Sequence, residues 1–171
     1  SMFGTFVEAG GNLIDCAHVY SDWIAVDGIH EVGRCERVTG EWMKRNKNRH
    51  DIVLTSKGGH PVFTNPHYDL HINRCSKADM RGDLEGSLEL LQTDYIDLGM
   101  IHYVDSEEEW DQIQTSDYMD YVMDLKKRGV IRHIGMSSHN PKVALKAAQS
   151  GYVEMILFSI NPVFDMLPAS E

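Results

Sequence analysis

Three apolar runs of the sequence each end in a side chain that can bind or move a proton. "LID" ends in Asp15, "IVLTSK" ends in Lys57 and "LGMIH" ends in His102. Tyr20 follows Asp15 by five residues. An ammonium group beside a phenol lowers the phenol's pKa from its ordinary value of about 10, and a carboxylate can hold that ammonium in place. With a histidine to orient the substrate, these residue types suit the protonation of an oxygen that becomes an alkoxide, as a carbonyl oxygen does when it receives hydride.

Such a cluster forms only if the strands that carry these residues end at the same side of a sheet. The hydrophobic patterns and the capping residues predict that strands and helices alternate along the chain. The predicted strands cover residues 12–16, 51–57, 94–102, 131–138 and 154–162. Helices are predicted at 2–10 and 35–46, from Ser76 onward, from the acidic run 106–111, and at 116–129 and 140–151.

This alternation predicts an α/β fold with a parallel sheet, in a single domain over residues 1–171. The pattern alone fits both an open doubly wound sheet and a closed eight-stranded barrel. In α/β barrels the active site lies at the carboxyl ends of the strands. The endings at Asp15, Lys57 and His102 therefore favour a catalytic cluster over a coincidence of strand ends.

Composition excludes several classes of function. The net charge of −10 disfavours binding to nucleic acid or to an anionic membrane, which both reward clustered Lys and Arg. No apolar run approaches the roughly 20 residues of a membrane span. Cys16, Cys35 and Cys75 form no metal-binding or redox motif, so we interpret them as reduced thiols of a cytoplasmic protein.

Five stretches resemble the ordered signature blocks of the aldo-keto reductases. They are "GGNLIDCAHVYSD", "LTSKGGHP", "GSLELLQTDYIDLGMIH", "GVIRHIGMSSHNP" and "FSINPVFD", and together they cover nearly the whole chain. The resemblance implies a (β/α)8 barrel of the TIM type that reduces aldehydes or ketones with NADPH, or occasionally NADH. It also implies a catalytic tetrad of Asp15, Tyr20, Lys57 and His102, with Tyr20 as the general acid.

The resemblance also suggests where the cofactor and the substrate bind. It places Ser137 and Ser138 near the nicotinamide carboxamide and adds Asn161, in "FSINPVFD", as a cofactor-binding residue. Ser138 departs from the Asn that is frequent in the family, and a Leu stands at 157 where many members carry Gln. Trp23 follows Tyr20 closely, so we interpret it as a substrate-binding residue.

The chain is shorter than a full barrel of about 250 residues. The resemblance matches about five βα units, with no counterpart for the first family strand or the last two units, so we expect an incomplete barrel. In the family the last third grips the adenosine 2′-phosphate, so weak NADPH binding by this chain alone is expected. Because the terminal strands would have unpaired edges, we expect one of three outcomes: a homodimer through the open barrel edges, a distorted partial barrel, or a longer natural chain that supplies the missing strands. The "FSINPVFD" block is closest to a bacterial branch that includes iron–sulfur members, but no cysteine cluster for such a module is present.

Other functions stay open at this point. One is a non-catalytic or regulatory relative of the barrel enzymes, with impaired cofactor binding. Another is a metal-dependent hydrolase, which is disfavoured because the strand ends lack an H-x-H or carboxylate ligand set. His67, His71 and Cys75 have i, i+4, i+8 spacing, but nearby prolines predict a loop, so no metal site is predicted.

Overall fold

The computed structural model describes residues 1–60, 74 and 76–161. Strands and helices alternate over this part of the chain, as the sequence predicts. The strands are β1 (Leu13–Asp15), β2 (Val53–Gly58), β3 (Ile96–Ile101), β4 (Ile131–Ser138) and β5 (Met155–Phe158). The helices are α1 (Met2–Glu8), α2 (Arg34–Asn46), the short 3-10 helix η1 (Arg49–Asp51), α3 (Lys77–Leu91), α4 (Glu107–Thr115), α5 (Asp117–Lys127) and α6 (Pro141–Gln149).

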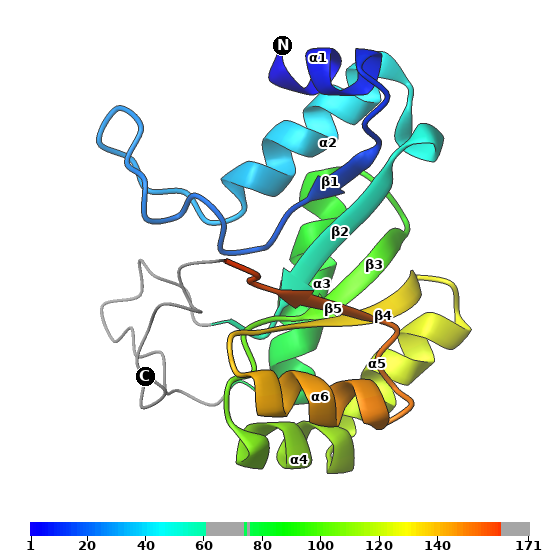
Figure 1. Cartoon of the computed structure of the whole chain (residues 1–171). Coiled ribbons are helices and arrows are strands. Elements are labelled where there is room, and N and C mark those ends of the chain that lie inside the picture. The colour runs from blue at the N-terminus through cyan, green and yellow to red at the C-terminus, as the bar shows by residue number, and fades with distance from the viewer. Residues whose placement is uncertain (61–73, 75, 162–171) are drawn as a thin grey trace.

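The five strands form one parallel sheet in the order in which they occur along the chain. A doubly wound sheet reverses its strand order at a switch point, whereas a barrel adds each new strand beside the last. The predicted α/β fold of incomplete TIM-barrel type is therefore confirmed. The doubly wound alternative is wrong for the described strands. Helices α2 to α6 line the outer face of the curved sheet (Figure 1).

The hydrophobic core lies between the sheet and these helices. Along β1, Ile14 is 6% exposed and points toward the helices, whereas its neighbour Leu13 is 47% exposed on the inner face. This alternation follows from the two-residue period of a strand. Buried side chains from the sheet and the helices fill the core, among them Leu54, Met80, Ile96, Trp110, Val122, Ile134 and Val143.

Side-chain caps fix the start of several helices. Ser76 caps α3 and accepts a hydrogen bond from the backbone N–H of Asp79, whose carboxylate in turn accepts from the backbone N–H of Ser76. Asp79 thus completes a capping box in which Glu or Gln is usual. Asn140 caps α6 ahead of Pro141, as predicted.

The last strand is shorter than the sequence predicts. β5 ends at Phe158, which pairs with Ser138, the final residue of β4. Residues 159–161 lie beyond that partner, so their backbone has no strand on the β4 side with which to pair. Among the described strands, β1 and β5 each pair on one side only.

No helix of the described residues is long and apolar enough to cross a membrane.

Candidate active site

The loops that follow the strands meet at one end of the sheet. Because all five strands are parallel, their carboxyl ends point the same way, toward the left in Figure 1. The longest of the described loops, residues 16–33, joins β1 to α2. Asp15 ends β1, Lys57 is the penultimate residue of β2, and His102 directly follows β3. Tyr20 lies in the long loop.

The ammonium group of Lys57 is the centre of this end of the sheet. Its side chain is fully buried. Its Nζ donates to Asp15 Oδ2 at 2.6 Å and to the Tyr20 hydroxyl at 2.8 Å. It also donates to the carbonyl oxygen of Cys16 at 3.0 Å. These three acceptors use all three donors of the ammonium. The tyrosine hydroxyl is therefore held by a charge-assisted hydrogen bond.

His102 forms the other side of the same cluster. Its ring lies edge-on to that of Tyr20, with centroids 5.8 Å apart. Burial and the nearby His60 and Lys57 hold the pKa of His102 well below its usual range. The imidazole is therefore neutral at physiological pH, and its buried Nδ1 has no hydrogen-bond partner among the described residues. A neutral imidazole with an uncommitted nitrogen suits the positioning of a polar substrate.

The structure thus brings Asp15, Tyr20, Lys57 and His102 together at one end of the sheet, while their catalytic roles stay predictions. The Tyr20 hydroxyl also lies 3.5 Å from Asp15 Oδ2. Asp15 keeps about a third of its side chain exposed. A proton donor held by a buried cation at a solvent-accessible position is the arrangement that general acid catalysis requires.

Ser137 and Ser138, at the end of β4, differ in their surroundings. The Ser137 Oγ accepts a hydrogen bond from the backbone N–H of Tyr103 at 2.8 Å. The Ser138 hydroxyl contacts Asp105 at 3.1 Å and both the N–H and the carbonyl of Asn140. Ser138 thus joins the two loops after β3 and β4, whereas the hydroxyl hydrogen of Ser137 is uncommitted within the described part of the chain.

Of the remaining predicted residues, Trp23 lies at the edge of the cluster. The Trp23 ring is edge-on to Tyr20 with centroids 6.4 Å apart, and half of the residue is exposed. Asn161 is the last described residue, exposed and beyond β5. His67, His71 and Cys75 lie outside the described residues, and no group of three potential metal ligands occurs in the part that the structure describes.

Two contacts at this end were not predicted from the sequence. The carbonyl of Cys16 accepts from Lys57, and no sequence signal could reveal a backbone acceptor. The ring of His60 lies 4.8 Å from that of His102. His60 follows Lys57 by three residues, so its position in the loop after a strand that ends in a candidate residue was the available signal.

Comparison with known proteins decides the family. The model of the Aldo/keto reductase family matches residues 1–169. The chain belongs to the aldo/keto reductase family. The norsolorinic acid reductase B of Aspergillus parasiticus is 32% identical over 147 residues, which are 84% of this chain and 34% of that protein.

Solved aldo-keto reductases have the same fold. The holo form of the enzyme from Bacillus halodurans is 27% identical, with a TM-score of 0.70 over 92% of this chain and 46% of that one. An aldo-keto reductase of Klebsiella pneumoniae in complex with NADPH is 26% identical, with a TM-score of 0.57 over 84% of this chain and 40% of its own. The chain therefore spans about a third to a half of the length of these aldo-keto reductases.

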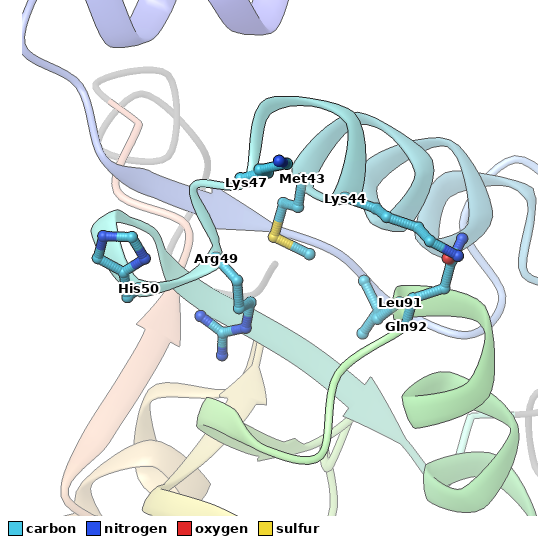
Figure 2. Close-up of a pocket in the computed structure, with 7 residues that line it drawn as sticks. All are labelled: Met43, Lys44, Lys47, Arg49, His50, Leu91 and Gln92. Carbon is cyan, nitrogen blue, oxygen red and sulfur yellow. The ribbon is translucent and has the colours of Figure 1, made fainter.

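A second depression lies far from the tetrad. It is formed by the end of α2, by η1, which precedes β2, and by the residues that precede β3, so it lies at the amino ends of the strands. In barrels this end contributes stability and not catalysis. Figure 2 shows the side chains that line it: Met43, Lys44, Lys47, Arg49, His50, Leu91 and Gln92.

Proposed function

We propose that this protein reduces an aldehyde or ketone with hydride from NADPH or NADH, with Tyr20 as the proton donor. One observation carries the proposal: the buried ammonium of Lys57 contacts both the Asp15 carboxylate and the Tyr20 hydroxyl, at 2.6 and 2.8 Å. Membership of the aldo/keto reductase family supports the same activity.

The chemistry follows from the charges. The bound cofactor supplies the hydride. As the carbonyl carbon accepts it, negative charge develops on the carbonyl oxygen, and Tyr20 donates its proton to that oxygen. Lys57 stabilises the phenolate left behind, since a cation favours the charged form of a neighbouring acid. Asp15 orients the ammonium, and His102, neutral because of its lowered pKa, donates a hydrogen bond to the substrate oxygen.

The described residues suit the nicotinamide end of the cofactor in part. Ser137 has a hydroxyl hydrogen that can donate to a carboxamide oxygen, and it lies on the strand next to β3, after which His102 follows. The hydroxyl of Ser138 is already engaged by Asp105 and Asn140, so we propose that it shapes the loop. Asn161 completes the proposed cofactor contacts. Titration with NADPH, followed by its fluorescence, tests whether the chain alone binds weakly.

We propose that the substrate enters beside Trp23. The loop that carries Tyr20 and Trp23 presents further exposed apolar side chains, Ile24, Val26 and Ile29. An apolar loop next to a proton donor suits a carbonyl compound with a hydrophobic body. Reduction of an aryl aldehyde more efficiently than of a short aliphatic aldehyde, and loss of that preference in Trp23→Ala, is the expected result.

The test of the activity itself follows the hydride. NADPH deuterated at the transferred position is mixed with the protein and a panel of aldehydes and ketones, and the product is examined by mass spectrometry. Deuterium on the former carbonyl carbon is expected. If no carbonyl on the panel consumes cofactor, the proposal is wrong for this chain.

We also propose that the open strand edges are covered by another strand, as in a homodimer. The edge strands β1 and β5 present unpaired backbone groups among the described strands, and such edges recruit further strands. Inner-face side chains such as Leu13 and Leu157 are more than 40% exposed. Light scattering should give twice the mass of 19.4 kDa. A clean monomer that binds no hydrophobic dye would contradict the proposal.

The free thiols support a reducing, cytoplasmic location. Cys16 and Cys35 are both free thiols, and each influences the pKa of the other. Neighbouring thiols stay reduced in the cytosol and tend to pair in oxidising compartments. Fractionation of the source cells should recover the protein with cytosolic markers; recovery with secreted proteins would contradict this location.

A further inference from the structure

A buried carboxylate lies behind the tetrad and belongs to none of the predicted sites. Glu36, in the first turn of α2, is fully buried. Its Oε1 accepts a hydrogen bond from Ser56 Oγ at 2.5 Å. Its Oε2 lies 3.4 Å from Nδ1 of His18. Carboxylates are rarely buried in full unless they are paired, so this one needs a compensating charge.

The two partners of Glu36 belong to the two segments that carry the proton donor and its cation. Ser56 immediately precedes Lys57 in β2. His18 lies between Asp15 and Tyr20, and its backbone N–H donates to the carbonyl of Lys57 at 3.3 Å. The carboxylate of Glu36 therefore connects the Tyr20 loop, residues 16–33, to the strand that carries Lys57.

The charges around His18 favour its protonated form. Burial opposes protonation, but contact with Glu36 and the nearby carboxylate of Asp83 outweigh it, so the pKa of His18 is raised. Arg74 opposes this effect and pairs with Asp83 at 3.0 Å. Apart from the Glu36–His18 contact itself, neither Glu36 Oε2 nor His18 Nδ1 has a hydrogen-bond partner among the described residues.

We propose that Glu36 is a positioning residue, whose buried contacts with His18 and Ser56 hold Tyr20 against Lys57. The inference rests on the proposed reductase activity for its kinetic consequences. Loss of the proton from His18 leaves Glu36 with Ser56 as its hydrogen-bond partner, and the Tyr20 loop then moves away from Lys57. Neither residue touches the reacting atoms.

The first test is Glu36→Gln, which keeps the size of the side chain and an acceptor for Ser56 but removes the charge. We expect kcat to fall about 10- to 100-fold, the scale of a misplaced catalytic group, with KM for the cofactor unchanged. The alkaline decline of kcat that follows the deprotonation of His18 should also disappear, because Glu36→Gln leaves no ion pair for that deprotonation to break. Glu41→Gln, an exposed position on the same helix, is the matched control.

A second readout does not depend on activity. Nuclear magnetic resonance titration of His18 should show a lower pKa in Glu36→Gln than in the wild type, together with weaker Overhauser contacts between Tyr20 and Lys57. If the wild type is inactive but these changes occur, the positioning role stands while the proposed function fails. If Glu36→Gln does not fold, Ser56→Ala, which removes one hydrogen bond, replaces it and should weaken the same contacts. Unchanged kcat and contacts, as in Glu41→Gln, would overturn the proposal.

Discussion

Ion pairs hold both ends of the sheet, but among the described residues only the cation at the carboxyl ends donates a hydrogen bond to a tyrosine hydroxyl. At the amino ends of the strands, Asp97 accepts hydrogen bonds from Arg49 at 2.8 Å, from Arg132 at 2.7 Å and from the backbone N–H of Leu54 at 3.0 Å. At the carboxyl ends, Lys57 contacts Asp15 and Tyr20.

At the amino ends of the strands, Arg49 and Arg132 interact with Asp97 and with groups close to it. Arg49 also donates to Thr93 and to the carbonyls of Ile52 and Tyr95. The Tyr95 ring lies between two guanidinium groups, 3.9 Å from that of Arg49 and 4.1 Å from that of Arg132. At the other end, Asp15 and Tyr20 are partly exposed although Lys57 is not. An ion pair alone therefore does not indicate function; a tyrosine hydroxyl that accepts a hydrogen bond from the cation does.

The largest expected effect is on catalysis, from Lys57→Met. This change removes the cation that stabilises the phenolate, so we expect kcat/KM for carbonyl reduction to fall about 10²- to 10⁴-fold, the usual contribution of general acid catalysis. Steady-state kinetics measures the effect. Lys47→Met, in the depression at the amino end, serves as the control and should leave the rate unchanged (Figure 2). Equal losses in both variants would abolish the distinction between the two ends.

Asp97→Asn should have the opposite effect, a loss of stability without a loss of catalysis. The guanidinium of Arg49, whose side chain is only 17% exposed, then loses its counter-charge, and breaking such a pair costs about 3 kcal/mol of the free energy of unfolding. Turnover per folded molecule should not change. Urea denaturation followed by circular dichroism gives the stability. Asp124→Asn, which breaks an exposed pair with Arg128, should cost far less. Loss of turnover in folded Asp97→Asn protein would mean that the amino end also serves catalysis.

Because of His102, the free energy of unfolding should fall at acid pH. Because its pKa is lowered in the fold, the unfolded chain binds a proton that the folded protein does not. Stability is therefore complete above the unfolded pKa of about 6.5 and declines as the pH falls below it. His102→Gln should flatten this decline by up to about 1.4 kcal/mol per pH unit. The exposed His50, replaced in the same way, is the control; identical slopes for wild type and His102→Gln would refute the assignment.

The smallest effect is expected from Arg132→Gln. Its side chain is 54% exposed, so its pair with Asp97 is screened by solvent even though Asp97 is buried. The loss should be below about 1 kcal/mol and should shrink further in high salt. Thermal denaturation at two salt concentrations measures it. A loss as large as that of Asp97→Asn would show that solvent does not weaken the pair between Arg132 and Asp97.

Local patterns predict the alternating strands and helices of a parallel sheet, whereas the barrel and the full tetrad with Tyr20 follow from the resemblance to the aldo-keto reductases. Apolar runs that end in Asp15, Lys57 and His102 place these residues at one end of any parallel sheet. The contacts of Glu36 and Asp97 were not predictable in the same way. Each carboxylate is buried by partners far away in the chain, and a lone acid in a helix or strand carries no signal of its partner.

A comparison of Tyr20→Phe with Tyr95→Phe tests the central claim most directly. Each ring lies beside a cation, 4.3 Å from Lys57 Nζ for Tyr20 and 3.9 Å from the Arg49 guanidinium for Tyr95, and each variant removes only a hydroxyl. We expect Tyr20→Phe to lower kcat for carbonyl reduction by about 10²-fold or more with unchanged cofactor affinity, since the hydroxyl acts on the developing alkoxide. Tyr95→Phe should retain the wild-type rate. Equal rates in the two variants would show that Tyr20 is not the proton donor.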